Sequence, residues 1–188
     1  VNPWKLYTLV AFVALAVRLP LVYFFQDDGG DTALYETVAL NILNNACVSM
    51  SSPLSGACVP HWGGNQLPGY PLFLAAVWSI FGKSALAANA AQAVIWTAAV
   101  CYLVSAVWRL TDSWIAALAV GMVMALSPLQ IPWVRMTLTE SLTFTTTLWV
   151  FAELVFSLAS RQLRVLPLAI ALAAAIFIRY DQIFLCFA

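Results

Sequence analysis

The sequence predicts an all-α polytopic membrane protein, with about five transmembrane helices and two juxtamembrane helices in a long first outer loop. Composition, charge and the length of the apolar segments predict this class. Apolar residues make up 63% of the 188 residues, charged residues only 9%, and the mean hydropathy is +0.91. A soluble domain of this size needs more polar side chains to cover its surface, so lipid is the expected solvent for much of the chain. The formal net charge is zero and no basic run occurs, which argues against nucleic acid as a partner.

Long apolar segments recur along the chain, and each is a candidate transmembrane helix. They cover roughly residues 4–25, 84–108, 113–128, 137–159 and 165–188. The first segment is as long as a span and lacks the pattern of a cleavable signal. Because the chain begins at Val1 rather than Met and stops at Ala188 inside an apolar segment, we expect residues 1–188 to be a single transmembrane module of a longer chain.

The apolar segment 71–82 decides the topology. It is bounded by Pro71 and Gly82, and it is short for a span, so it suits an interfacial or re-entrant helix. If it lies at the interface and the N-terminus is cytoplasmic, the inner cations are Lys5, Arg109, Arg161 and Arg164, and the outer ones are Lys83 and Arg135. If it crosses the membrane, three of these six cations lie on the inner side (Lys5, Lys83 and Arg135) and three on the outer side. The positive-inside rule therefore favours the first topology, which we place in a bacterial inner membrane.

In this topology, residues 26–83 form an outer loop with a single Lys and no Arg. Its segment 31–44 has the pattern of an amphipathic helix. The apolar stripe consists of Leu34, Tyr35, Val38, Ala39, Ile42 and Leu43, and the polar positions are Thr37, Asn41 and Asn44. Gly29 and Gly30 precede the segment, and Asp31 is well placed as its N-cap. Together with a helix over 69–82, it predicts two juxtamembrane helices that frame a cavity at the outer leaflet.

Acidic residues gather where the first span leaves the membrane. Asp27, Asp28, Asp31 and Glu36 are half of the eight acids in the chain. Other ionisable residues stand near the outer end of a predicted span. Arg18 is in the first span, and Glu140, Arg179 and Asp181 are in later ones. Charges at membrane depth are costly and tend to mark sites or pathways. The alternative is that these charges have no functional role. Arg18 and Arg179 would then snorkel to the interface and pair with acids such as Asp27 and Glu140. Asp31 would only cap its helix, and Glu36 would be solvated.

The cysteines agree with an outer, oxidising location for the loop. Cys47 and Cys58 share it and can form a disulfide there. Cys101 and Cys186 lie in predicted spans, where cysteine is ordinary apolar filling. His61 is the only histidine, so an imidazole-based zinc site is not expected.

Several short motifs, taken in order, resemble a known family. Arg18 stands near the end of the first span, followed by "GDTALY" at 30–35, "LPGYPLFLAAVWSIFG" at 67–82 and "LSP…RMTLTESL" at 126–142. This order resembles the C-type (GT-C) membrane glycosyltransferases, in particular the branch of protein mannosyltransferases and lipid A aminoarabinose transferases. The resemblance implies a glycosyltransferase that takes a sugar from a polyprenyl-phosphate donor at the non-cytoplasmic face of the membrane.

The resemblance also implies roles for individual residues. Asp31, four residues before Tyr35, matches the family's catalytic acid in the first outer loop, which acts as general base or holds a divalent metal where members use one. Asp27 and Asp28 are alternatives for that acid in a different loop register. The leaving phosphate needs cationic or hydrogen-bonding partners. The candidates for binding substrate or phosphate are Arg135, Arg179, Glu140, His61, Gln66 and Tyr35. Many relatives have a basic residue where this chain has Gln66-Leu67, which weakens the phosphate assignment there.

Two other functions remain open at this stage. One is a non-catalytic, truncated GT-C-like subunit that packs against other membrane proteins, to which the small-residue stretch "SALAANAAQA" at 84–93 is suited. The other is a transporter or channel. Against it, Glu153 is the only acid expected in mid-membrane and has no evident basic partner, and the sequence shows no inverted repeat.

Overall fold

The computed structural model describes residues 2–25, 30–51, 67–128 and 130–187. Within these ranges the chain is helical and contains no strand, which confirms the all-α class. The α-helices are α1 (Pro3–Phe24), α2 (Thr32–Asn45), α3 (Gly69–Phe81), α4 (Ala85–Thr111), α5 (Trp114–Ala125), α6 (Thr139–Ser160) and α7 (Val165–Ile178). Two segments are 3₁₀-helical, η2 (Ile131–Arg135) and η3 (Tyr180–Phe187).

Three of the described helices, α1, α4 and α6, are long and apolar enough to cross a membrane. The helices α5 and α7 have 12 and 14 residues and are about 18 and 21 Å long at 1.5 Å per residue, against a hydrocarbon core of about 30 Å. The expectation of one continuous span over 165–188 is wrong. The α-helix ends at Ile178, and η3 folds back so that Leu185 packs beside Ala171 and Ala175 of α7.

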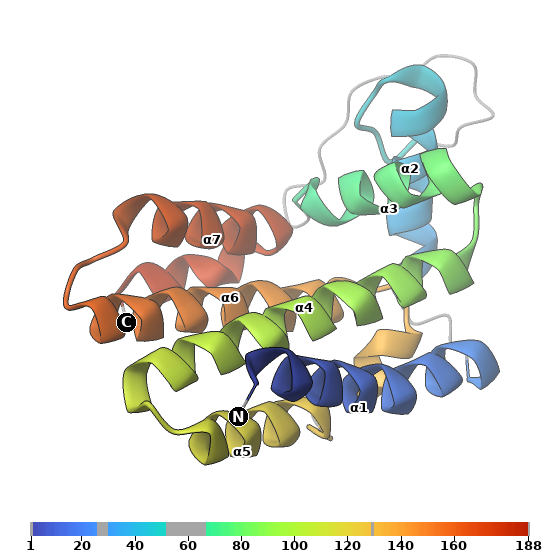
Figure 1. Cartoon of the computed structure of the whole chain (residues 1–188). Coiled ribbons are helices and arrows are strands. Elements are labelled where there is room, and N and C mark those ends of the chain that lie inside the picture. The colour runs from blue at the N-terminus through green and yellow to red at the C-terminus, as the bar shows by residue number, and fades with distance from the viewer. Residues whose placement is uncertain (1, 26–29, 52–66, 129, 188) are drawn as a thin grey trace.

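The long helices α4 and α6 lie side by side and run parallel at the centre of the bundle, with α1 and α5 on one side and α7 on the other (Figure 1). The main core joins α1, α4, α5 and α6 and consists of Leu6, Val10, Trp96, Val100, Leu103, Val104, Ala117, Leu148 and Ala152. Gly121 allows α5 to approach this core closely. A Cβ there would lie 2.7 Å from Val104 and 2.9 Å from Val10.

The connections gather at opposite ends of the bundle (Figure 1). At one end, which we call the α2/α3 end, α1 finishes, α2 and α3 lie, and α4 and α6 begin. At the opposite end, α4 turns into α5 and α6 turns into α7. Arg109, Arg161 and Arg164 all belong to these two turns or to the residues beside them.

The two segments predicted as juxtamembrane helices are helical, as α2 and α3. They pack against each other at the α2/α3 end. Their core consists of Tyr35, Ala39, Tyr70, Leu74, Ala75, Val77, Trp78, Ala88 and Leu142. The predicted stripe of α2 is only partly right. Leu43 is exposed and Asn41 is buried, because the Asn41 amide donates to the carbonyls of Ser49 and Ser51 at 2.8 and 2.7 Å. Those two hydrogen bonds satisfy a buried polar group and fold the chain after α2 back onto the helix.

Glu36 lies on the same helix and was expected to be solvated. Instead its carboxylate lies 2.7 Å from the Lys83 ammonium, which joins α2 to the turn between α3 and α4. Lys83 is also 5.8 Å from the centre of the Trp78 ring. The pair is partly exposed, so its contribution to stability is small.

Arg18 is buried rather than snorkelling to the surface. Its side chain points into the bundle, where Nε donates to Gln130 Oε1 at 2.8 Å and Nη1 to the Ala125 carbonyl at 2.6 Å. The Trp96 ring lies 5.3 Å from the guanidinium carbon. The alternative partner considered from the sequence, Asp27, lies outside the described residues. Arg18 thus binds the carboxyl end of α5, where helix carbonyls carry partial negative charge.

A second set of buried amides fixes the chain between η2 and α6. Asn89 donates to the Arg135 carbonyl at 2.9 Å, and Gln92 donates to Asn89 at 3.0 Å. Gln130 donates to the Ser141 hydroxyl at 3.2 Å. These polar side chains from the apolar helix α4 and from the connection therefore determine where α6 begins.

Candidate functional site

A polar cavity of about 360 Å³ lies at the α2/α3 end. Residues from the starts of α2 and α6 and from the end of α7 line it, together with Leu67 before α3. The described lining residues are Asp31, Tyr35, Leu67, Thr139, Glu140, Ile178, Arg179 and Tyr180. Four of the predicted site residues, distant in sequence, thus share one cavity: Asp31, Tyr35, Glu140 and Arg179.

Asp31 stands at the N-cap position of α2, as predicted. Its backbone carbonyl accepts from the amides of Leu34 and Tyr35, both at 3.1 Å, but its side chain makes no capping hydrogen bond. A purely capping role therefore does not account for the carboxylate, which is exposed on the wall of the cavity. The next residue holds the helix in place, because the buried Thr32 hydroxyl donates to the Thr137 carbonyl at 3.3 Å.

Tyr35 lies one turn further along α2 and connects the cavity wall to the core. Its ring meets the Tyr70 ring edge to face, with 5.1 Å between centroids, and its hydroxyl is hydrogen-bonded to Thr139. Burial raises the pKa of Tyr35, and the carboxylates of Asp31 and Glu140 raise it further, against the opposing effect of the Thr139 hydrogen bond. The phenol consequently stays protonated near neutral pH and can donate a hydrogen bond.

Arg179 connects α7 to α6 through charge. Its Nη1 lies 3.1 Å from Glu140 Oε1, in the first turn of α6. Its Nε and Nη2 bind the two carboxylate oxygens of Asp181 at 3.3 and 3.1 Å. A two-pronged carboxylate contact of this kind orients the planar guanidinium. The ion pairing of Arg179 with Glu140 that the sequence suggested is thus present, and it lies on the cavity wall.

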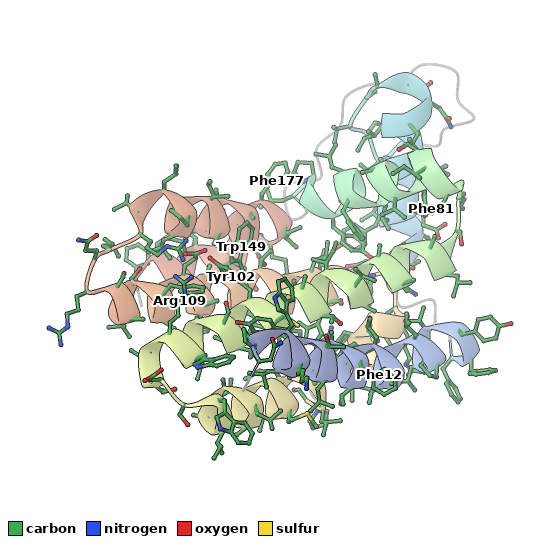
Figure 2. The ribbon with its side chains drawn as sticks, in the orientation of Figure 1. Phe12, Phe81, Tyr102, Arg109, Trp149 and Phe177 are labelled. Atoms are coloured by element: carbon green, nitrogen blue, oxygen red, sulfur yellow. The ribbon has the colours of Figure 1, made fainter. Side chains whose placement is uncertain are left out.

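A glycine brings α3 against the end of α7, next to this ion pair. A Cβ at Gly69 would lie 2.3 Å from the carbonyl oxygen of Phe177 and 2.7 Å from its carbonyl carbon. These are backbone atoms and cannot rotate away, so only glycine fits. Figure 2 labels Phe177 at this junction of α7 and α3. The "PGYP" motif therefore sets the distance between α3 and the residues that precede Arg179.

Other predicted site residues are not brought to this cavity or lie outside the described residues. Arg135 ends η2, and it is not among the described lining residues. Asp27, Asp28, His61 and Gln66 lie outside the described residues. Cys47 is disulfide-bonded, but its predicted partner Cys58 also lies outside them, so the pairing stays a prediction. Cys101 and Cys186 are free, as expected, although Cys186 lies in η3 rather than in a span.

Sequence reasoning missed two groups that shape the site. Thr139 and Tyr180 line the cavity beside the predicted residues. The only feature of the sequence that could have indicated them is that Thr139 precedes Glu140 and Tyr180 follows Arg179. The supporting amides Asn89, Gln92 and Gln130 were missed as well. Their signal was the presence of amide side chains within or beside apolar segments, where each needs a partner.

The described lining combines two carboxylates, one guanidinium, two phenols and a threonine hydroxyl. Such a set suits a polyhydroxylated ligand, because it offers both donors and acceptors. The part of the chain that the structure describes contains no group of three or more His, Cys, Asp and Glu side chains that could hold a metal ion. The described residues therefore do not form a metal centre of this kind.

A second cluster of ionisable side chains lies toward the opposite end of the bundle, and Glu153 is not isolated there. Its carboxylate lies 2.9 Å from Arg164 Nη1 and accepts from the Tyr102 hydroxyl at 2.6 Å. Trp149 Nε1 also donates to it, at 3.3 Å. The expectation that Glu153 has no basic partner is wrong, because the tight turn from α6 to α7 returns Arg164 to its side.

In comparisons with protein-family models, curated proteins and solved structures, the chain matches none of them.

Proposed function

We propose that this chain carries the catalytic acid of a glycosyltransferase, which moves a sugar from a polyprenyl-phosphate donor to an acceptor at the non-cytoplasmic face of a membrane. The observation that supports the proposal is the convergence of Asp31, Tyr35, Glu140 and Arg179 on one polar cavity. These residues come from three separate segments. Asp31, Tyr35 and Glu140 lie in motifs that resemble those of the GT-C family, and Arg179 was a candidate because of its charge.

The proposal includes a membrane placement. In it, α1, α4, α5, α6 and α7 cross the membrane, while α2 and α3 lie on its outer side, at the α2/α3 end of the bundle. The direction of the chain alternates from one of these five helices to the next (Figure 1), and Arg109, Arg161 and Arg164 then share the inner side, as the positive-inside rule favours. The N-terminus is cytoplasmic, the membrane is a bacterial inner membrane, and the polar cavity faces the periplasm.

In the proposed reaction, the Asp31 carboxylate accepts the proton of the acceptor hydroxyl as that oxygen attacks the anomeric carbon of the sugar. The bond from this carbon to the phosphate oxygen breaks, and the polyprenyl phosphate leaves with the bonding electron pair. Attack from the face opposite the leaving group inverts the anomeric centre. Tyr35 and Thr139 are placed to hold sugar or acceptor hydroxyls.

Among the described residues that line the polar cavity, Arg179 is the cation that can bind the leaving phosphate. Its guanidinium is occupied by Glu140 and Asp181, with Asp181 41% exposed in its side chain. Exposed ion pairs contribute little free energy, so a phosphate can replace Asp181 at small cost, while Glu140 keeps the guanidinium in position. Asp181 therefore acts as a stand-in for the phosphate when no donor is bound.

Transfer by the full-length natural protein tests the proposal. Asp31→Asn removes the base and should lower the transfer rate by about 10²- to 10⁴-fold, the usual contribution of a general base. Glu36→Gln is the matched control, since it removes a carboxylate from the same helix that pairs with Lys83 and does not line the cavity. Unchanged transfer by Asp31→Asn would overturn the catalytic role. A wild-type protein that transfers no sugar but copurifies with other membrane subunits would favour the non-catalytic alternative.

A further inference from the structure

Two adjoining cavities lie at the end of the bundle opposite the polar cavity, and they share Arg164 and Pro167. The first is about 500 Å³, lies between α4, α6 and the start of α7, and has mainly apolar walls, including Ile95, Ala98, Ala99 and Trp149. The second is about 710 Å³, and Arg109, Phe156 and Gln162 line it beside the shared residues. Tyr102, Trp149 and Arg109 mark this region in Figure 2.

The second cavity holds two guanidinium groups beside one aromatic ring. The guanidinium carbon of Arg109 lies 5.4 Å from the centre of the Phe156 ring, and that of Arg164 lies 4.8 Å from it. Contacts of this type stabilise a cation and orient it. Two like charges placed beside one ring repel each other, so the arrangement favours an anion near both.

Only one of these charges is balanced within the described part of the chain. Glu153 lies 2.9 Å from Arg164, and Tyr102 Oη accepts from the same guanidinium at 3.1 Å. Arg109 makes no ion pair with any described residue, and no described acid lines the second cavity. The pair of cavities therefore combines one surplus positive charge with an adjoining apolar space.

The surroundings indicate a lipid as the occupant. The α6–α7 turn and the first residues of α7 expose Leu163, Val165 and Leu166 by 64, 64 and 71%. Large apolar side chains at this exposure suit contact with lipid tails rather than water. A ligand at this position thus meets a cation at one end and a hydrocarbon environment at the other.

We propose that these two cavities bind an anionic phospholipid, with its phosphodiester against Arg109 and Arg164 and one acyl chain in the apolar cavity beside Trp149. Glu153 and Tyr102 position Arg164 without neutralising Arg109. The proposal rests on the membrane placement given above, in which this lipid belongs to the cytoplasmic leaflet. It does not depend on glycosyl transfer, which takes place at the other end of the bundle.

The test measures binding to the full-length protein in a neutral detergent, with no sugar donor present. Phosphatidylglycerol and phosphatidylcholine of the same acyl composition are titrated separately, with thermal stabilisation and native mass spectrometry as readouts. Phosphatidylglycerol should bind at least fivefold more tightly, since an arginine near an anionic lipid contributes about 1 kcal/mol. Arg109→Gln should remove most of that preference, and Arg109→Lys should keep a large part of it.

Arg161→Gln is the matched control. It removes an exposed arginine from the α6–α7 turn that does not line either cavity, and it should keep the preference within twofold. Equal binding of the two lipids, or an equal loss in Arg161→Gln and Arg109→Gln, would overturn the proposal. Equal stabilisation by inorganic phosphate would also overturn it, because the ligand would then be a free anion. If Arg109→Gln fails to fold, the wild-type comparison of phosphatidylglycerol with phosphatidylcholine and with inorganic phosphate still decides.

Discussion

Arg179 Nη1 lies 3.1 Å from Glu140 Oε1 and thereby ties the residue after α7 to the first turn of α6. Both side chains line the polar cavity, and both are partly exposed, with 38 and 27% of their side-chain surfaces accessible. The pair is thus positioned to act on a ligand more than to hold the fold together.

This relationship gives the first prediction. Arg179→Gln and Glu140→Gln should each lower sugar transfer by at least tenfold, because the phosphate loses its cation or the cation loses its orientation. Each should change the free energy of unfolding by less than about 1 kcal/mol, as is usual for exposed pairs. The double variant should be no worse than Arg179→Gln alone, since the two act as a unit. Additive losses in transfer would show that Glu140 acts independently of Arg179.

The second prediction concerns the close approach of α3 to α7. Gly69→Ala should destabilise the protein by about 1–3 kcal/mol, the usual range for overpacking, because its Cβ meets the Phe177 carbonyl at 2.3 Å. It should also lower transfer by moving the end of α7. Gly30→Ala is the control, since a Cβ there has nothing within 4 Å. Thermal unfolding of both variants decides, and equal melting temperatures would contradict the prediction.

The third prediction concerns the buried arginine of α1. Arg18→Leu should lower stability by about 1.5–3 kcal/mol, the range for hydrogen bonds to a charged group. The lost bonds are those to Gln130 and to the Ala125 carbonyl at 2.8 and 2.6 Å. Arg161→Leu, at an exposed position, should leave stability within about 0.5 kcal/mol. Reversible unfolding in mixed micelles measures both variants, and a stable Arg18→Leu would mean that the buried charge is not structural.

The fourth prediction tests the membrane placement. In a background with Cys101 and Cys186 replaced by alanine, Gln162→Cys should resist a membrane-impermeant thiol reagent in intact cells and react after the cells are opened. Asn44→Cys, which is exposed on α2, should react in intact cells. Helix α2 and the α6–α7 turn lie at opposite ends of the bundle (Figure 1), so labelling of Gln162→Cys in intact cells would reverse the topology.

Hydropathy and helix signals were sufficient to predict the all-α class and, within a few residues, the bounds of α1, α2, α3, α4 and α6. They could not predict where α7 ends. A sliding average treats Arg179 as one charge within an apolar segment, whereas its pairing with Glu140 and Asp181 stabilises it at the point where the helix stops. Glu153 was misjudged for the same reason, since its partner Arg164 becomes a neighbour only after the turn from α6 to α7 forms.

Similar reasoning explains what was missed around the candidate site. Asp31, Tyr35 and Glu140 were selected by motif resemblance and Arg179 by its charge, and their common cavity follows from packing between distant segments. Arg18 and Gln130 are 112 residues apart in sequence, so no local pattern relates them. Asn41 and Leu43 exchanged their expected environments because the Ser49 and Ser51 carbonyls provide partners for the amide.

The backbone contact between Gly69 and Phe177 has a mechanical consequence in the proposed placement. A helix of 14 residues is shorter than a typical bilayer core, so the membrane around α7 must thin or the helix must shift along its axis. Because α3 rests directly on the last turn of α7, a shift of that kind moves α3 and changes the width of the polar cavity. Lipid chain length should therefore tune the activity of the site, with shorter acyl chains matching the resting position of α7.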